Sequence, residues 1–237
     1  MNIKEYWEKP DVVSMTDPRV SKIESSIISS FIKSTDTVLD IGCGDGSGSY
    51  LYRDKCSYLG VERSKEMICR YKKVCPGVKI IESDMMLIDD IGKYSVIVCQ
   101  RSLINLENRS QQRFMLKKIS DMLLEGGKLI LCEAFEEGLS SLNLIRVEVG
   151  LKELIPHWHA TYLNDSLVSE CLSSKCKLIQ EEDLSVYFLM TRVLHASLVE
   201  NPSADSLFNE IAEKIQLSNL VKLKNTSFIK VQVWERK

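Results

Sequence analysis

The stretch that decides the fold spans residues 38–49 and reads Val-Leu-Asp-Ile-Gly-Cys-Gly-Asp-Gly-Ser-Gly-Ser. A short, mostly apolar run is followed by four glycines that alternate with small or polar residues, and a helical pattern starts at about residue 50. This order predicts a strand, a tight turn and a helix. Glycine tolerates positive φ and lets a ligand approach the backbone, and the start of a helix offers unpaired N–H groups. The stretch therefore predicts a nucleotide-binding loop.

The spacing of the glycines narrows this prediction. Glycines 42, 44 and 46 follow the pattern Gly-x-Gly-x-Gly, whereas the dinucleotide fingerprint needs a glycine or alanine at position 47, which is Ser47 here. Asp40 lies on the strand two residues before the first glycine, where its carboxylate can accept hydrogen bonds from the loop or from a cationic ligand. The pattern Asp-x-Gly-x-Gly-x-Gly resembles motif I of the class I S-adenosylmethionine-dependent methyltransferases.

Two further carboxylates follow at informative intervals. A second strand is expected at residues 57–62, and Glu62 ends it 20 residues after Gly42, the interval at which a βαβ unit brings a carboxylate beside the first loop. Such a carboxylate can accept both ribose hydroxyls, although Glu62 could also cap the helix that follows. A third strand is expected at residues 78–82. It precedes Asp84, which could accept from an adenine amine or could be an ordinary turn residue.

The rest of the pattern predicts an α/β protein. Residues 94–99 form a continuous apolar run, as in strands that parallel sheets bury on both faces. A helix is expected through about residue 123, ended by Gly126-Gly127. Further strands are expected at residues 128–134, 177–189 and 226–234. The resemblance implies a three-layer class I methyltransferase sandwich, with a mostly parallel seven-stranded sheet, an antiparallel last strand and helical insertions over the acceptor site.

The chain is expected to form one methyltransferase domain over residues 1–237. Its predicted parts are N-terminal helices acting as a lid (1–33), a cofactor-binding core (34–135), an insertion over the acceptor site (136–164) and a second helical insertion (190–225).

Composition limits the class of partner. A net charge of −2 and a pI near 6.0 leave no basic stripe for a nucleic-acid backbone, so a small-molecule acceptor is favoured. Eight cysteines occur singly, without the Cys-x-x-Cys pairs of zinc or redox sites. The N-terminus has no apolar leader and no run is long enough to span a membrane, so a cytoplasmic protein without membrane insertion is expected. The oligomeric state stays open.

The resemblance covers residues 34–135 and implies S-adenosylmethionine as cofactor, with S-adenosylhomocysteine as product and no metal. Carried over by position, it implies that Asp40 and the glycines bind the methionine part, Glu62 the ribose, Asp84 the adenine, and the Gln100 backbone the methionine end. The implied cofactor-binding residues are Asp40, Gly42, Gly44, Gly46, Glu62, Arg63, Asp84, Met85 and Gln100.

The absence of several known motifs argues against some classes of methyl acceptor. After the fourth strand there is no Asn- or Asp-Pro-Pro-aromatic motif, which amino-group methylases of nucleic acid and protein carry there. No aspartate ends that strand to hold Mg²⁺, and Cys99-Gln100 lacks the proline of the cytosine C5 methylases. A buried strand cysteine is the better interpretation of Cys99.

The acceptor side carries a second resemblance. Residues 101–106 (Arg-Ser-Leu-Ile-Asn-Leu) and Trp158-His159-x-x-Tyr162 are similar to bacterial methyltransferases of surface-polysaccharide and small-molecule pathways. This implies O-methylation of a sugar or phosphorylated sugar in capsule, lipopolysaccharide or related biosynthesis. N-methylation of a small amine or natural product is the alternative. The candidate acceptor-binding residues are Arg101, Asn105, Trp158, Tyr162 and Arg192.

Methylation of a hydroxyl needs a base, because a sugar hydroxyl is too weak an acid to ionise alone. Histidine, with an ordinary pKa of about 6.5, suits that role at neutral pH. His159 is the first candidate base, His157 the second and Glu133 the third. If extended, the two histidines would share a face, so a metal site is conceivable, but no cysteine or acid lies nearby in sequence.

Two interpretations of other classes remain. A nicotinamide-dependent oxidoreductase would share the glycine loop and Glu62, but would not need Asp84. A non-catalytic cofactor-binding subunit would keep the fold without turnover.

Overall fold

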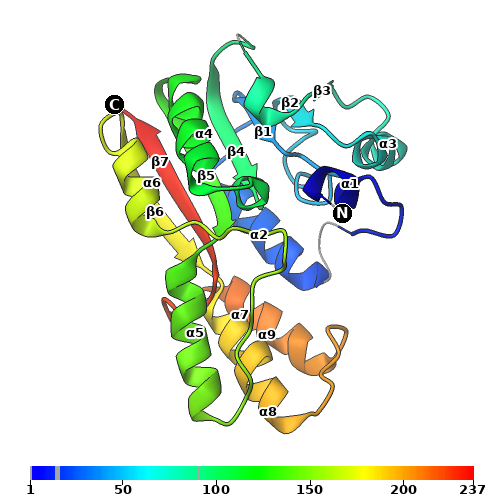
Figure 1. Ribbon diagram of the computed structural model, residues 1–237, viewed down its shortest axis with the longest axis vertical. Coiled ribbons are helices and arrows are strands. Elements are labelled where there is room, and N and C mark those ends of the chain that lie inside the picture. The colour runs from blue at the N-terminus through cyan, green and yellow to red at the C-terminus, as the bar shows by residue number, and fades with distance from the viewer. Residues whose placement is uncertain (1, 14–16, 90) are drawn as a thin grey trace.

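The computed structural model describes residues 2–13, 17–89 and 91–237, and within them seven strands form one mixed sheet with helices on both faces (Figure 1). The strand order is β3-β2-β1-β4-β5-β7-β6. The strands are β1 (Thr37–Ile41), β2 (Ser57–Glu62), β3 (Ile80–Glu82), β4 (Tyr94–Gln100), β5 (Leu123–Ala134), β6 (Cys176–Asp183) and β7 (Ile229–Arg236).

Strand directions confirm the predicted fold class. The first five strands pair in parallel, and β7 lies antiparallel between β5 and β6. The chain leaves β1 toward β2 on one side and returns to β4 on the other, so the order reverses at β1. In open α/β sheets a ligand crevice forms outside the carboxyl ends of the strands at such a reversal.

Helices cover both faces of this sheet. They are α1 (Ile3–Trp7), α2 (Pro18–Ser30), α3 (Lys65–Val74), α4 (Arg109–Asp121), α5 (Glu136–Glu148), α6 (Asp165–Leu172), α7 (Ser185–Phe188), α8 (Ala196–Leu198) and α9 (Leu207–Ser218), with short turns η1 (Met85–Leu87) and η2 (Leu103–Asn105) and a π-helical segment η3 (Leu189–His195). The longest have 13 residues, so the described part of the chain contains no helix that could cross a membrane.

Alternating strand residues build two separate cores. Leu39 and Ile97 belong to the core under α4 and α6, whereas their neighbours Val38 and Val96 belong to the core under α2, α7 and α9. All four side chains are buried. Burial on both faces explains the continuous apolar runs in the sequence.

Side-chain caps fix several helix starts. Asp17 accepts from the Arg19 N–H ahead of Pro18, Ser64 accepts from the Met67 N–H, and Asn164 accepts from the Leu167 N–H. The last two residues lie directly before α3 and α6, whose first turns they cap.

The helix predicted after the glycine loop does not form. Residues 47–55 make turns, and β2 already begins at Ser57. Side chains bind carbonyls that a helix would have used: Arg53 Nη1 donates to the Gly46 oxygen at 2.9 Å and Ser25 Oγ to the Gly48 oxygen at 2.8 Å. The loop is therefore fixed by one contact from within the turns, made by Arg53, and one from α2, made by Ser25.

Two strand boundaries also differ from the prediction. Strand β6 ends at Asp183, and its expected continuation to residue 189 is instead helical, because the Asp183 carboxylate accepts from the Ser185 N–H at 2.9 Å and turns the chain. Strand β5 begins at Leu123, so Gly126 and Gly127, predicted to end a helix, lie inside a strand that shifts register beside Tyr94.

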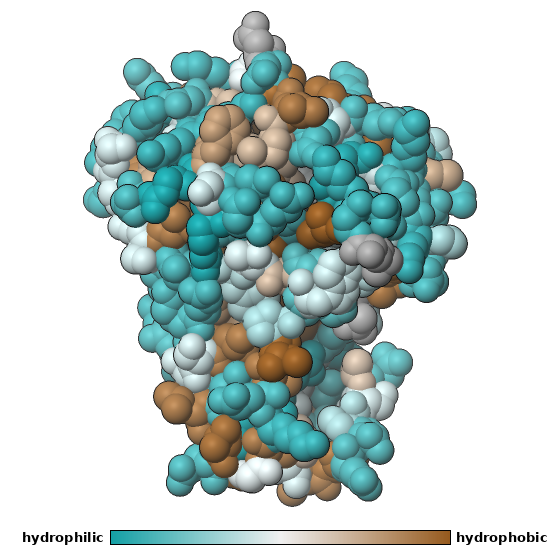
Figure 2. Space-filling model, in the orientation of Figure 1, coloured by the Kyte–Doolittle hydropathy of each residue, from teal (hydrophilic) through white to brown (hydrophobic). Residues whose placement is uncertain are grey.

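The two insertions pack on each other at one end of the sheet, where α5 lies beside η3 (Figure 1). Arg146 of α5 joins them, since its guanidinium donates to the carbonyls of Lys152 and Arg192. Figure 2 shows apolar patches over this end, where Leu144 and Leu198 are about three-quarters exposed, at 74% and 76%. The insertions thus bury some apolar side chains against each other and leave others at the surface.

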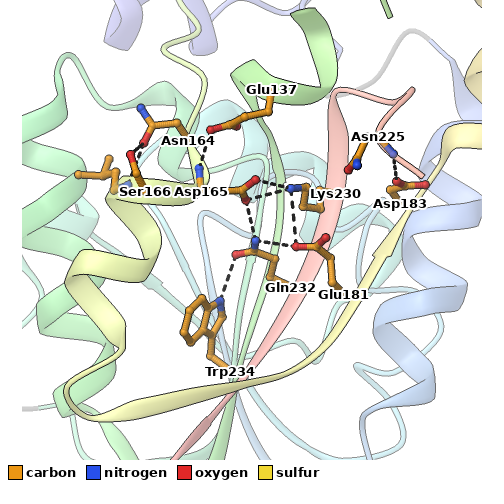
Figure 3. Close-up of polar contacts among 11 residues, drawn as sticks. Glu137, Asn164, Asp165, Ser166, Glu181, Asp183, Asn225, Lys230, Gln232 and Trp234 are labelled. Carbon is orange, nitrogen blue, oxygen red and sulfur yellow. Dashed lines mark hydrogen bonds and ion pairs between the residues drawn. The ribbon is translucent and has the colours of Figure 1, made fainter. Parts of the chain in front are cut away.

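A buried lysine fastens α6 to the antiparallel strands (Figure 3). Lys230 of β7, 5% exposed, donates to both carboxylate oxygens of Asp165 at 2.9 and 2.7 Å and lies 3.6 Å from Glu181 Oε2. Gln232 donates to the same two carboxylates, each at 2.9 Å, and accepts from the Trp234 indole at 3.1 Å. The cation thus offsets two acids on neighbouring elements.

We expect Lys230→Met to lower the free energy of unfolding by about 1–3 kcal/mol. Breaking a fully buried ion pair typically costs roughly 3–5 kcal/mol. We expect a smaller loss here, because Asp165 is partly exposed and still accepts a hydrogen bond from Gln232. Urea unfolding measures it. Lys175→Met, which breaks a surface pair with Asp121, is the control and should cost under about 0.5 kcal/mol. Equal stability of Lys230→Met and the wild type would contradict the assignment.

Candidate active site

A cavity opens at the carboxyl ends of β1, β2 and β4, where the strand order reverses. Its empty volume is about 740 Å³ with the open mouth included. Seven of the predicted cofactor-binding residues line it: Gly42, Gly44, Glu62, Arg63, Asp84, Met85 and Gln100. Residues far apart in sequence thus meet in one crevice.

The glycine loop bends tightly along this wall. Gly42 and Gly44 have φ of +75° and +56°, in the left-handed region that favours glycine. A Cβ on Gly42 would lie 2.5 Å from the Ser102 Cβ, whereas one on Gly44 would meet no atom within 4 Å. The backbone at Gly42 must therefore carry no side chain, and the backbone at Gly44 faces open space.

Glu62 ties the end of β2 to this loop. Its Oε1 accepts from the N–H groups of Arg63 and Ser64, both at 2.8 Å, and its Oε2 accepts from the Gly44 N–H at 3.0 Å. Burial raises the pKa of Glu62, against the effect of these hydrogen bonds. A carboxylate offers about four lone-pair positions, so acceptor capacity remains on Oε2 toward a ligand hydroxyl.

Asp84 lies across the cavity from the loop, at the start of η1. Its Oδ1 accepts from the Met86 N–H at 3.1 Å, and its Oδ2 pairs with Lys4 Nζ at 3.1 Å and lies 3.9 Å from Arg63 Nη1. Although burial opposes ionisation, the Met86 hydrogen bond and the Lys4 charge bring the pKa of Asp84 below its ordinary value. Asp84 is thus an anion inside a partly apolar cavity.

The N-terminal helix α1 supplies part of the cavity wall through Trp7. Its Lys4 pairs with Asp84, a contact that no sequence pattern indicated. The Trp7 carbonyl accepts from Ser64 Oγ at 2.9 Å. The Glu8 carboxylate accepts from the Lys65 N–H at 3.2 Å, at the start of α3. These contacts hold α1 beside α3 (Figure 1). The capping box of Asn2 and Glu5 was the available signal for this helix.

Asp40 and Gly46, both predicted to bind the cofactor, do not line the cavity. Asp40 is buried beneath the loop, where its Oδ2 accepts from the hydroxyls of Tyr58 at 2.8 Å and Tyr52 at 3.0 Å. Burial raises the pKa of Asp40 to about 6. A Cβ on Gly46 would come within 2.4 Å of the Tyr71 ring. Both residues therefore shape the loop through contacts with Tyr52, Tyr58 and Tyr71. No sequence pattern indicated a role for these three tyrosines.

Gln100 and Arg101, at the end of β4, also line the cavity and share one buried acid. Gln100 Nε2 donates to Glu24 Oε2 at 2.6 Å, and Arg101 Nε lies 3.2 Å from the same oxygen. Burial raises the pKa of Glu24, and the Arg101 charge opposes that rise. Arg101 has a φ of +50°, an uncommon value for a residue with a side chain and one that is enriched at functional sites. Sequence patterns did not indicate this role of Glu24. The one sign of it in the sequence is an acid next to Ile23, on the side of helix α2 that is buried.

The predicted base His159 contacts two residues of the cavity wall. Its Nδ1 lies 3.0 Å from Asn105 Oδ1, and its ring centroid lies 5.4 Å from that of Trp7. Burial and the neighbouring His157 lower the pKa of His159 to about 4, so its ring is neutral at pH 7. A neutral imidazole can accept a proton.

His159 belongs to an aromatic cluster, which we define as Tyr6, Trp7, His157, Trp158 and His159. The His159 ring lies 4.7 Å from Tyr6, 4.3 Å from His157 and 5.4 Å from Trp158. Trp158 is 56% exposed. The cluster thus joins α1 to the first insertion and presents ring surface to solvent beside the cavity.

Three other predicted residues lie elsewhere. Tyr162 stacks on Phe228 with ring centroids 5.6 Å apart. Arg192 pairs with Asp17 at 2.5 Å, so the second insertion contributes no residue to the cavity lining. Glu133 is fully buried under η2.

Glu133 supports η2 from below. Its Oε1 accepts from the backbone N–H groups of Ser102 at 3.0 Å and Leu103 at 2.8 Å. Burial raises the pKa of Glu133 to about 8, against the effect of these bonds, so it is mostly protonated at neutral pH. Since it does not line the cavity, this geometry gives no support to Glu133 as a base.

Across the described ranges, no group of three or more histidines, cysteines or acids is arranged to hold a metal ion. His157 and His159 therefore have no third ligand there.

Residues 38–127 match the model of a family described as methyltransferase domain. No curated protein matches the chain by sequence. Its fold is similar to that of three solved structures. Magnesium protoporphyrin IX methyltransferase ChlM from Synechocystis PCC 6803, with bound S-adenosylhomocysteine, is 14% identical (TM-score 0.61), covering 98% of this chain and 94% of that one.

The second structure, the N-methyltransferase NodS from Bradyrhizobium japonicum in complex with S-adenosylhomocysteine, is also 14% identical (TM-score 0.62; 99% and 96% covered). The third, the CcbJ methyltransferase from Streptomyces caelestis, is 12% identical (TM-score 0.60; 99% and 96% covered). At these identities the likeness shows the fold. The family match, which includes the glycine loop and both cavity carboxylates, identifies residues 38–127 as a methyltransferase domain, and the described chain has the class I methyltransferase fold.

Proposed function

We propose that the chain methylates a hydroxyl group of a small sugar or phosphorylated sugar, of the kind used in bacterial capsule, lipopolysaccharide or related biosynthesis. The observation that carries the proposal is the position of His159. A neutral histidine contacts the cavity wall through Asn105 and Trp7, in a cluster of aromatic rings.

The cavity suits the cofactor in its charges and surfaces. Glu62 would accept ribose hydroxyls, and Asp84 would accept from the adenine amine while Met85 covers the ring. When bound, S-adenosylmethionine supplies a methyl carbon on a sulfonium sulfur; the acceptor oxygen bonds to this carbon as the carbon–sulfur bond breaks and its electron pair stays on sulfur.

We expect Glu62→Ala to weaken S-adenosylhomocysteine binding by about ten- to a hundredfold, or about 1.5–3 kcal/mol. The change removes the ribose acceptor and frees the Gly44 N–H. Calorimetry measures it, with Glu82→Ala as control, since Glu82 ends the neighbouring strand with its carboxylate half exposed. Unchanged affinity of Glu62→Ala would contradict the assignment, and tight NADH binding by the wild type would favour an oxidoreductase.

The aromatic rings and Arg101 support a sugar as the methyl acceptor. The faces of aromatic rings pack well against the C–H face of a sugar, and the rings of Trp158 and Tyr6, with centroids 5.5 Å apart, belong to the aromatic cluster whose member Trp7 lines the cavity. Arg101 in the wall would attract a phosphate group, which a guanidinium fork suits. Glu24 holds Arg101 in place, so the charge is fixed in position before the acceptor arrives.

His159 would accept the hydroxyl proton while the oxygen attacks. The ring is unprotonated at any pH well above about 4, so it needs no further activation. The same low pKa makes it a weak base, which favours a second candidate: a small amine that is already deprotonated and needs alignment alone.

A release assay separates the candidates. The purified chain is incubated with S-adenosylmethionine and, in separate reactions, with uridine-diphosphate sugars whose sugar carries no amine, with sugar phosphates and with amino sugars, and S-adenosylhomocysteine is measured. The proposal predicts release above background with an acceptor that carries hydroxyls and no amine. Release with amine acceptors alone would favour N-methylation, and no release above background with any acceptor, despite cofactor binding, would favour a non-catalytic subunit.

A further inference from the structure

Asn105, the last residue of η2, makes two side-chain hydrogen bonds that together fix its orientation. Its Nδ2 donates to the Arg101 carbonyl at 2.7 Å, and its Oδ1 lies 3.0 Å from His159 Nδ1. A carbonyl oxygen can only accept, so the amide end that faces Arg101 must be the nitrogen. The amide oxygen therefore faces the histidine.

This orientation determines where the His159 ring carries its hydrogen. An amide oxygen is only an acceptor, so Nδ1 must donate and must carry the hydrogen. A neutral imidazole has one N–H, so the lone pair lies on Nε2. The other ring groups near His159 are Tyr6 and Trp7 of α1 and its chain neighbours His157 and Trp158, and none has a hydrogen bond to either ring nitrogen in the described structure.

We propose that Asn105 is a positioning residue, which holds His159 in the tautomer with hydrogen on Nδ1 and so makes Nε2 the atom that takes the acceptor's proton. The inference deepens the proposed function and rests on His159 as its base. In the step, the hydroxyl proton moves to Nε2 and the ring becomes an imidazolium, stabilised at Nδ1–H by the amide oxygen of Asn105.

The backbone around η2 is built to hold Asn105 still. The Arg101 N–H donates to the Cys132 carbonyl of β5 at 2.8 Å, which anchors the residue whose own carbonyl binds Asn105. Glu133 holds the N–H groups of Ser102 and Leu103 at the start of the turn. A chain of hydrogen bonds, buried at β5 and partly buried at Asn105, thus runs from β5 through η2 to the histidine.

The chain offers a simple spectroscopic test, because it has three histidines. In the full chain labelled with ¹⁵N-histidine, two-bond proton–nitrogen spectra distinguish the Nδ1–H from the Nε2–H tautomer, and His159→Gln and His157→Gln assign the signals. His195 is an internal reference, since its Nδ1 lies 2.9 Å from Asn209 Oδ1 in the same kind of contact.

We expect wild-type His159 to carry its hydrogen on Nδ1, and Asn105→Leu to shift it mainly to the Nε2–H form of free histidine without changing His195. Asn105→Asp, which keeps an oxygen acceptor and tests the idea should the leucine variant fold poorly, should retain the Nδ1–H form and raise the pKa of His159 by at least about one unit. A wild-type Nε2–H form, or an unchanged tautomer in folded Asn105→Leu, would overturn the proposal.

Turnover separates this inference from the proposed function. If both hold, Asn105→Leu loses at least about tenfold in kcat, and Asn105→Asp recovers part of the loss, with cofactor affinity unchanged. If the tautomer depends on Asn105 while His159→Gln turns over normally, His159 is not the base; the proposed role of Asn105 in proton transfer then fails with it.

Discussion

His159→Gln should lower turnover about a hundredfold or more while leaving S-adenosylmethionine affinity within about twofold of the wild type. Glutamine can still hydrogen-bond to Asn105 but cannot take a proton, and general-base assistance is typically worth about 10²–10⁴-fold. Turnover is measured by S-adenosylhomocysteine release and affinity by calorimetry, which separates the chemical step from cofactor binding.

The matched control is His157→Gln, which changes the adjacent histidine of the aromatic cluster and should reduce turnover far less. The pH profile gives a second check. Because burial and His157 lower the pKa of His159 to about 4, wild-type turnover should stay level from about pH 5 to 8 and fall as the ring protonates near pH 4. Near-normal turnover by His159→Gln would reject the base and favour an amine acceptor.

Glu133→Gln should make the protein markedly more stable than the wild type at pH 8, but not at pH 4. Burial raises the pKa of Glu133 from 4.5 to about 8 in the folded chain. The folded state therefore holds a proton that the unfolded state releases, so the wild type loses stability from this group as pH rises from about 4.5 to 8. The free energy of unfolding lost over this pH range is a few kcal/mol, because each unit of pKa difference corresponds to about 1.4 kcal/mol.

The glutamine variant keeps an oxygen to accept from Ser102 and Leu103 but has no proton to lose. Urea unfolding from pH 4 to 9 compares the two proteins. The control is Glu137→Gln, for which little change is expected, because the Glu137 carboxylate accepts from the Asp165 backbone N–H in an exposed position. Parallel stability curves for the wild type and Glu133→Gln would contradict a raised pKa.

Much of the sheet could be predicted because its determinants are local. Apolar runs located strands such as β4, which was expected at residues 94–99 and is observed at Tyr94–Gln100. Glu62 and Asp84 could be placed at the cavity because parallel strands end at one edge of the sheet, whatever the connections between them.

What could not be predicted depends on contacts between distant segments. Asp40 occupies the motif position but faces Tyr52 and Tyr58, whose hydroxyls meet it only after the loop has folded back. The segment after the glycine loop forms turns in place of the expected helix, and Ser25 of α2, 23 residues before Gly48, binds the Gly48 carbonyl there. Neither interaction leaves a periodic pattern in the sequence.

Among the candidate acceptor-binding residues, too, position could be predicted only where the sheet fixes it. Arg101 and Asn105 reach the cavity because they directly follow β4, whose end is fixed by the sheet. Arg192 has no such constraint, and a buried aspartate in another part of the chain, Asp17, binds it instead.

The most direct test of the account follows the methyl group itself. The chain is incubated with S-adenosylmethionine carrying a ¹³C-labelled methyl group and the sugar acceptor that gives release, and NMR of the isolated product locates the label. We expect a labelled methyl on a sugar oxygen, and none with His159→Gln at the same protein concentration and reaction time. A label on nitrogen, or an equal yield from His159→Gln, would contradict it.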